Sequence, residues 1–267
     1  MSGTRNRTRT IPDVMVGTRG EVPRWATEMA RDRVAAALGL APEPVLFARV
    51  RLEVSPDPAV ARRATCQVNA DVNGRLVRVQ VAAAGLRESI DLAHDRLRGR
   101  LERIGRNWEA VRGARPKPGP NEWRHGAEPA HRPDYYPRPA AEREIVRHKA
   151  YALERQSVDE AVFDMDMMDY DFSLFTDVAT GQDSVVYRSG DGYRLAQAEP
   201  PAERADPVAV PLTVSPQPAA RLDEAEAIER LEMSGQPFVF FVDRATGRGR
   251  VLYHRYDGHY GLIVPVA

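Results

Sequence analysis

An internal repeat in the second half of the chain constrains its fold more than any other feature. The tripeptide Ala179-Thr180-Gly181 recurs 66 residues later as Ala245-Thr246-Gly247. The same shift applies without a gap from Val158 to Gly192 and relates these further pairs: Phe172 and Phe238, Phe175 and Phe241, Val185 and Val251, Tyr187 and Tyr253, Asp191-Gly192 and Asp257-Gly258. A tandem duplication of this length predicts two copies of one small domain.

Each copy has the pattern of a small β-rich domain with the element order β-α-β-β-β. The helix is expected at 158–168 in the first copy and at 224–234 in the second. Three strands should follow each helix, because turn residues such as Thr180-Gly181 separate short apolar runs. We therefore expect repeat domains at 145–197 and 208–267, joined by a proline-containing connector at 198–207.

Residues 1–112 predict an α+β domain with the order β-α-β-β-β-α. Strands are expected at 14–17, 45–54, 63–72 and 75–81, and helices at 22–38 and 86–108. Asn73-Gly74 between two alternating runs is typical of a type I′ hairpin turn. Two helices should cover one face of a four-stranded sheet through these apolar positions: Trp25, Met29, Val34 and Leu38 in the first, Ile90, Ala93, Leu97, Leu101 and Ile104 in the second.

A proline-rich segment at 113–144 separates this domain from the repeats. Proline interrupts helices and central strands, and here it recurs at positions 116, 118, 120, 129, 133, 137 and 139. We interpret the segment as a linker, which as a flexible coil would span roughly 30 Å.

The charge of the chain is divided between its two halves. Residues 1–124 hold 23 basic and 14 acidic side chains, whereas residues 125–267 hold 15 and 24. A basic half indicates a polyanionic partner such as nucleic acid. The alternative interpretation is that the two kinds of charge are segregated by chance.

Arginines of the N-terminal domain are the candidate RNA-binding residues. The spacing of Arg96, Arg100 and Arg103 predicts a ridge on the last helix. Strand parity places Arg49, Arg51, Arg63 and Arg78 on the solvent side of the sheet. An ordinary solvated charged face is the competing interpretation. The full candidate set is Arg24, Arg31, Arg49, Arg51, Arg63, Arg78, Arg87, Arg96, Arg100, Arg103 and Arg106.

Nothing in the sequence indicates an enzyme, a cofactor or a metal site. The six histidines show neither triad nor zinc spacing, and no glycine-rich phosphate loop is present. The acidic stretch 164–171 is interpreted as the outer side of a helix, and Cys66 as a buried packing residue. No apolar run is long enough to span a membrane, and residues 1–10 lack a signal sequence, so we expect a cytoplasmic protein without membrane contact.

The repeats resemble the C-terminal domain of long-form ribosome hibernation-promoting factors. The residues that carry the resemblance are Ile145-Val146-Arg147-His148-Lys149, Ser157-Val158-Asp159-Glu160-Ala161 and Val185-Val186-Tyr187-Arg188 in the first copy, and Asp257-Gly258-His259-Tyr260-Gly261-Leu262-Ile263 in the second. Residues 89–97 resemble part of the family's ribosome-binding domain, although Gly85-Leu86-Arg87 departs from the family's Asp-x-Tyr pattern. Two C-terminal copies are typical of dormancy-linked actinobacterial members.

This resemblance implies a non-enzymatic factor that binds the small ribosomal subunit. It implies binding to ribosomal RNA and proteins in the decoding and messenger channel, where the factor blocks messenger and transfer RNA under stress or dormancy. The alternative is a nucleic-acid-binding regulator of transcription or RNA that acts off the ribosome.

The family pairs such C-terminal domains between two factors and so joins two ribosomes. Two copies in one chain can pair with each other instead, because a short connector raises their effective concentration. We therefore expect an intrachain pseudo-dimer in a monomeric protein. Its predicted interface consists of Phe172, Phe175, Val185, Tyr187, Phe238, Phe241, Val251 and Tyr253.

Overall fold

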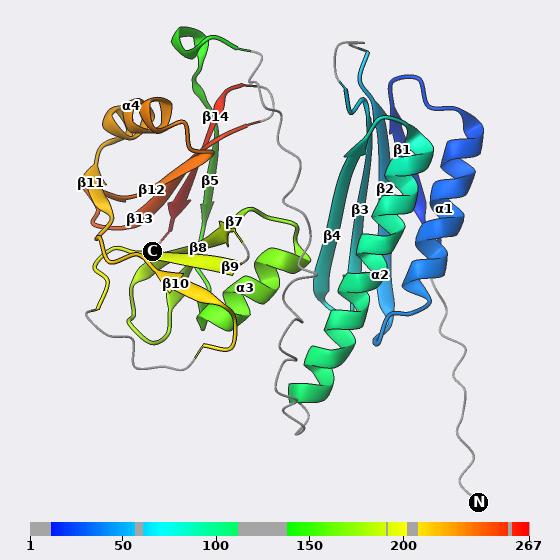
Figure 1. Ribbon diagram of the computed structural model, residues 1–267, viewed down its shortest axis with the longest axis horizontal. Coiled ribbons are helices and arrows are strands. Elements are labelled where there is room, and N and C mark those ends of the chain that lie inside the picture. The colour runs from blue at the N-terminus through cyan, green and yellow to red at the C-terminus, as the bar shows by residue number, and fades with distance from the viewer. Residues whose placement is uncertain are drawn as a thin grey trace, which may run out of the picture. The chain divides into compact units, whose positions relative to one another are not determined.

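A computed structural model describes residues 12–56, 61–111, 138–190, 192–201, 208–255 and 258–266, with backbone alone at 107–111 (Figure 1). The chain divides into two compact units. We call them the N-terminal domain, which ends with the helix that follows its sheet, and the C-terminal unit, which contains both repeats. Of the predicted linker, positions 113–137 lie outside the described residues, as do positions 202–207 of the connector. No helix in the described part of the chain is long and apolar enough to cross a membrane.

The N-terminal domain has the predicted order of elements. They are β1 (Met15–Arg19), α1 (Arg24–Leu38), β2 (Val45–Val54), β3 (Ala64–Val72), β4 (Arg75–Ala83) and α2 (Leu86–Val111). The sheet order is β1-β2-β3-β4, with β1 parallel to β2 and the other neighbours antiparallel. Helix α1 packs on β1 and β2, and α2 on β3 and β4. The predicted α+β fold, with two helices on one face of a four-stranded sheet, is confirmed.

The core of this domain follows the predicted periodicities except at the start of α1. All five residues of the predicted α2 stripe are buried. In α1 the prediction that Trp25 lies on the buried face is wrong. Its side chain is 45% exposed, and Ala26 and Ala30 occupy the buried face. Small side chains let α1 lie close to its neighbours, and the displaced Trp25 ring instead lies 5.3 Å from the Arg87 guanidinium.

The β3–β4 hairpin turns at the predicted dipeptide. Asn73 and Gly74 have φ values of 52° and 89°, and the paired residues on either side are Val72 and Arg75. The Gly74 amide also donates a 2.7 Å hydrogen bond to the Asp71 carboxylate. This turn fixes the register of the two strands, and so it fixes which side chains face solvent.

The C-terminal unit contains two repeats built in the same way. The first has β5 (Ile145–Tyr151), β6 (Arg155–Gln156), α3 (Val158–Met167), β7 (Phe172–Asp177), β8 (Asp183–Ser189) and β9 (Gly192–Gln197). The second has β10 (Leu212–Val214), β11 (Ala220–Leu222), α4 (Glu224–Ser234), β12 (Phe238–Asp243), β13 (Gly249–His254) and β14 (Tyr260–Pro265). A short 3-10 helix, η2 (Ala140–Glu142), precedes β5.

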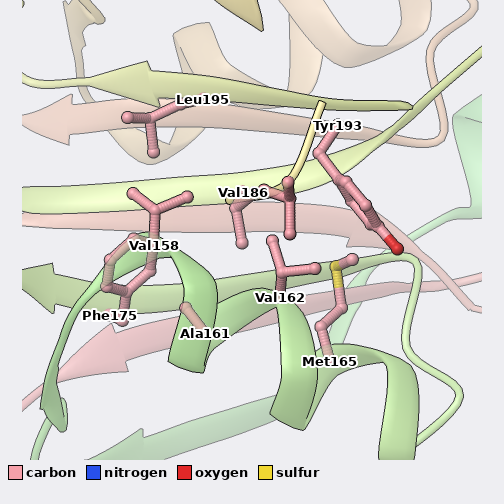
Figure 2. Packing of buried hydrophobic residues seen from close by; sticks show 9 residues of the cluster. Val158, Ala161, Val162, Met165, Phe175, Val186, Tyr193 and Leu195 are labelled. Carbon is pink, nitrogen blue, oxygen red and sulfur yellow. The ribbon is translucent and has the colours of Figure 1, made fainter. Parts of the chain in front are cut away.

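Each repeat packs its helix on one face of its sheet. Figure 2 shows Val158, Val162 and Met165 of α3 directed at Val186 and other buried side chains of the first sheet. Helix α4 makes the equivalent cluster in the second repeat. Both helices begin with a capping box at equivalent positions, Ser157 with Glu160 and Asp223 with Glu226.

The acidic end of α3 has a structural counterpart in the second repeat. Asp169 has a φ of 54°, and Gly235, which is 66 positions later, caps α4 with a φ of 62°. The left-handed region is open to glycine and tolerated by aspartate, so both residues end a helix. An acid at this place therefore needs no metal to explain it.

The recurring Ala-Thr-Gly motif forms the same turn in both repeats. Gly181 and Gly247 both have a φ of 69°, and each donates its amide to the carbonyl of the residue four positions earlier, Asp177 or Asp243. The Asp243 carboxylate accepts hydrogen bonds from the Thr246 amide and hydroxyl at 2.9 and 2.6 Å. The hydroxyl bond of Thr246 is the first cause that holds the pKa of Asp243 below its ordinary value.

Asp243→Ala should lower the free energy of unfolding by about 1–3 kcal/mol, because it removes the acceptor of the two Thr246 donors and the carboxylate that pairs with the mostly buried Arg250 at 3.1 Å. The pKa of Asp243 is depressed in the folded protein, so its contribution is complete at neutral pH. The contribution should disappear as the pH falls through the folded pKa. Urea unfolding at pH 7 and in acid measures both effects, with exposed Glu229→Gln as the control. Equal stability of the two variants would contradict the prediction.

The first strand of each repeat belongs to the sheet of the other repeat. The first sheet has the order β10-β9-β8-β7-β6, and the second has the order β11-β12-β13-β14-β5. Strand β5 therefore pairs with β14, and β10 pairs with β9, both in parallel. The predicted boundaries 145–197 and 208–267 follow the order of the sequence and do not specify this exchange.

The length of the loop between β5 and β6 explains this exchange. Strand β6 lies on one edge of the first sheet, and three strands separate it from the opposite edge. Crossing four strand spacings requires roughly 19 Å. The three residues 152–154 between β5 and β6 reach about 14 Å. Strand β5 therefore cannot reach the far edge of its own sheet and pairs with the neighbouring sheet.

Polar contacts anchor both exchanged strands. Before β5, the Arg143 Nη1 donates to both carboxylate oxygens of Glu232 of α4 at 2.7 and 2.8 Å, and the Tyr260 hydroxyl donates to the same carboxylate at 2.6 Å. Burial, followed by the contact with Glu232, raises the pKa of Tyr260 to about 12. Before β10, the Asp159 carboxylate accepts the backbone amides of Ala209 and Val210 at 3.0–3.2 Å. Each exchanged strand is thus tied to the helix of the repeat that receives it.

Candidate RNA-binding surface and repeat interface

The face of the N-terminal sheet opposite the helices is a band of arginine and amide side chains. In β2, Arg49 and Arg51 alternate with the buried residues Ala48, Val50 and Leu52. The register of β2, β3 and β4 forms two rows across the sheet. One row contains Arg49, Asn69 and Arg78, and the next contains Arg51, Gln67 and Gln80. We call Arg49, Arg51, Gln67, Asn69, Arg78 and Gln80 the open-face band.

Hydrogen bonds within the open-face band hold part of it in place. The Arg78 guanidinium donates to the Gln80 amide oxygen at 2.7 Å, while Arg49 and Arg51 are exposed. Glu53 lies on the same face and approaches Arg19 at 3.4 Å and Arg51 at 3.8 Å. Exposed pairs at such distances contribute little, so Arg51 stays available to a stronger anion. The band presents positive charge together with amide donors and acceptors.

Part of the arginine ridge predicted on α2 has a structural role within the domain. Arg96 donates to the Gln80 carbonyl at 3.1 Å, and Arg100 donates to the Arg78 carbonyl. Both carbonyls belong to β4, an edge strand of the sheet. These arginines therefore satisfy the strand edge, a role that helical spacing alone could not reveal. Arg103 and Arg106 follow further along α2.

The remaining predicted arginines lie elsewhere. Arg63 donates to the Ser55 carbonyl at 3.2 and 3.3 Å and so links the residue before β3 with the residue that follows β2. Arg24 and Arg31 are exposed on α1, and Arg87 is exposed at the start of α2 over the Trp25 ring. The structure thus brings Arg49, Arg51 and Arg78 together on the open face and places Arg24, Arg31 and Arg87 on the helical layer.

Sequence reasoning missed the uncharged part of this surface. The three amides of the open-face band share the parity of the arginines, which is a signal that the alternation already contained. At the hairpin end of the same face, Phe47 and Leu76 flank Asp71 and are 39% and 57% exposed. Apolar side chains at this end give the surface contact area that needs no charge.

Cys66 lies in the core, as its alternation with apolar residues predicts. Its side chain is fully buried in β3, and burial raises the pKa of the thiol to about 12. Only the thiolate reacts readily. A maleimide added to the native protein at pH 7.5 should therefore react at the rate of unfolding and label the protein rapidly in 6 M urea. Fast labelling of the native protein would contradict this placement.

Two sheets pack face to face inside the C-terminal unit. The cluster between them contains Leu174 and Val185 of the first repeat and Val251 and Ile263 of the second, with these partly buried neighbours: Leu153, Phe172, Tyr187, Ala196, Phe238, Phe240 and Tyr253. Because α3 and α4 pack with other residues of the same strands, they cover the outer faces. The unit is thus an intrachain pseudo-dimer with layers in the order helix, sheet, sheet, helix (Figure 1).

Ring contacts at this interface reveal a pseudo-twofold axis. Phe172 and its equivalent Phe238 lie 4.5 Å apart between ring centroids. The two contacts related by the axis are also present, Phe172 with Tyr253 at 5.9 Å and Tyr187 with Phe238 at 5.3 Å. In an isologous interface, equivalent residues meet on the axis and other contacts occur twice.

Six of the eight residues predicted for the interface lie in it, and two do not. The prediction is wrong for Phe175 and Phe241, because these side chains pack under α3 and α4 in the clusters on the outer faces. Phe172 and Phe175 are three positions apart on one strand, so their side chains point to opposite faces. Leu174 and Phe240 occupy the places that the two wrong residues were predicted to fill.

The repeats match a family model described as Sigma 54 modulation/S30EA ribosomal protein C terminus, at residues 140–195 and 215–262. The chain is 38% identical to a dormancy associated translation inhibitor of Mycobacterium tuberculosis, over 96% of this chain and 90% of that protein. It is 32% identical to a ribosome hibernation promotion factor of Deinococcus radiodurans, over 55% of this chain and 77% of that protein. The solved N-terminal domain of Protein Y from Thermus thermophilus aligns with 36% of this chain and 99% of that one, at 24% identity and a TM-score of 0.29.

A four-stranded α+β domain followed by S30EA-type C-terminal domains defines a long-form ribosome hibernation factor. The chain belongs to this family, as its identity with the mycobacterial relative over nearly the full length of both chains shows.

Proposed function

We propose that this protein is a ribosome hibernation factor that keeps cytoplasmic ribosomes inactive under stress or dormancy. The observation that carries the proposal is the 38% identity, over 96% of the chain, with a protein named as a dormancy associated translation inhibitor. The factor acts by occupying a site and performs no catalysis. It binds the small subunit in the decoding and messenger channel, where it excludes messenger and transfer RNA.

The open-face band supports RNA as the ligand of the N-terminal domain. Its three arginines suit phosphates, and its three amides can donate to or accept from sugar hydroxyls and base edges. Folded RNA is recognised mainly through shape, backbone and 2′-hydroxyl contacts, which suits a flat and mixed surface of this kind. Arg103, Arg106 and the exposed arginines of the helical layer add to the positive field that attracts the ribosome.

Sedimentation of purified ribosomal subunits with the purified protein tests the proposal. We expect the protein to travel with the small subunit and with whole ribosomes, and translation in a reconstituted system to fall. Increasing salt should release it, because phosphate contacts release counterions. A regulator that acts off the ribosome would stay at the top of the gradient, and that result would refute the proposal.

We also propose that the pseudo-dimer makes this factor monomeric through its C-terminal unit, so that it holds single ribosomes and does not join two. The interface that could receive a second molecule is already filled by the other repeat. Light scattering of the purified protein should give the mass of one chain. Gradients with the factor added should show whole ribosomes without ribosome dimers. A stable dimer formed through residues 145–267 would contradict this proposal.

A further inference from the structure

One contact on the pseudo-twofold axis differs in chemistry between the two repeats. Asp183 and Gly249 are the first residues of β8 and β13 and occupy equivalent positions. The Asp183 carboxylate accepts the Gly249 amide at 2.8 Å and the Arg248 guanidinium at 2.8 and 3.2 Å. The Asp183 side chain is 9% exposed, so most of this contact is shielded from water.

The contact depends on the missing side chain of Gly249. A Cβ at this position would lie 2.7 Å from the Asp183 Cβ and 2.8 Å from the Phe240 ring. Gly249 does not have a left-handed φ, so its backbone conformation would suit other residues. Close approach of Asp183 from the first repeat, together with the Phe240 ring of the second repeat itself, therefore explains glycine here. The residue before it also differs, since Arg248 in the second repeat corresponds to Gln182 in the first.

The same geometry would disfavour pairing of like repeats. In a pair of two first repeats, Asp183 would meet a second Asp183 within clashing distance, and Gln182 would supply no cation. A pair of two second repeats would leave a gap between two glycines and two Arg248 side chains without the carboxylate. Arg248 is 37% exposed, and salt screens its charge, so the steric clash and the buried carboxylate dominate the discrimination.

We propose that Asp183 and the Arg248-Gly249 pair are specificity determinants that allow the first repeat to pair only with a second-type repeat. The interface thus accepts the other half of its own chain and rejects the equivalent repeat of a second copy. This inference rests on the intrachain pairing proposed above and is independent of ribosome binding.

Two full-length variants test the selectivity by making the repeats alike. In the acidic variant, Arg248→Gln with Gly249→Asp gives both repeats the Gln-Asp sequence. In the basic variant, Gln182→Arg with Asp183→Gly gives both repeats the Arg-Gly sequence. Each variant alone should lose its internal pairing, so amide hydrogen exchange in β8 and β13 should accelerate roughly tenfold to a hundredfold.

Mixing distinguishes selective pairing from simple loss of stability. We expect the acidic and basic variants to form a complex of one chain each in native mass spectrometry, and the wild-type protein to form none. The inference is overturned if both variants keep wild-type exchange rates, if the acidic variant dimerises alone as well as it pairs with the basic one, or if the opened variants do not pair when mixed.

Milder substitutions keep the inference testable if the double variants fail to fold. Asp183→Asn preserves the shape of the side chain, Arg248→Gln shortens it, and each removes one charge. Each should lower the equilibrium constant for closing the interface roughly tenfold, and the double variant should lose less than the product of the two effects. Independent effects of the two changes would overturn the inference. No ribosome enters these measurements, so failure of ribosome binding cannot produce any of these results.

Discussion

A chain with Arg49→Glu and Arg51→Glu should bind the small ribosomal subunit about a hundredfold more weakly than the wild type, because two phosphate contacts become repulsive. The slope of log affinity against log salt should fall by about two units for the two lost contacts. Both side chains are exposed on the open face, so the fold should remain intact. Fluorescence titration of labelled protein with purified subunits at several salt concentrations measures both quantities.

The matched control is Arg24→Glu with Arg31→Glu, which makes the same change in net charge on exposed positions of α1. We expect this control to bind nearly as the wild type does. Equal weakening by both variants would assign binding to net charge and contradict a specific role of the open face. Arg96 and Arg100 are unsuitable for this test, because their loss would free two carbonyls on the edge of β4.

A chain that ends at residue 201 should misfold, aggregate or associate with another copy. It lacks β10, which completes the first sheet, and it lacks β14, the partner of β5. It also lacks Val210, which is 6% exposed in the core under α3. Exposed strand edges and an open sheet face favour association with another chain.

A chain that ends at residue 216 distinguishes the loss of β10 and Val210 from the loss of the second sheet. It regains β10, and with it Val208, Val210, Leu212 and Val214, which pack against the first core. We expect cooperative unfolding to return, with a melting temperature more than about 5 °C above that of the shorter chain. The apolar face that normally meets the second sheet should remain exposed and bind a hydrophobic dye. Identical behaviour of the two truncated chains would show that β10 does not stabilise the first sheet.

Local patterns were sufficient to predict the N-terminal domain. Strict alternation in β2, helical spacing in α2 and the Asn73-Gly74 turn each depend on residues close in sequence, so the pattern determines both the element and its buried face. The start of α1 failed for a physical reason. Trp25 is the larger apolar side chain, but the smaller Ala26 and Ala30 occupy the buried positions there.

Long-range choices were not predictable in the same way. Repetition identified the aromatic residues of the C-terminal unit, yet it could not assign Phe175 to the outer face, although strand parity could have. The exchange of β5 and β10 depends on a loop of three residues and on the position of β6 in the sheet, which only the assembled topology reveals. The roles of Arg96 and Arg100 follow likewise from the edge position of β4.

The exchanged strands also set the order in which the C-terminal unit can fold. Strand β10 follows its partner β9 after a short connector, whereas Ile145 of β5 must wait for Tyr260, which comes far later in the chain. Long-range pairing is slow because the intervening chain must be ordered before the contact forms. We therefore expect the first sheet to form early and the closure of β5 onto β14 to limit the rate of folding. The exchanged strands link the two sheets, so amide protons in both sheets should exchange at similar rates.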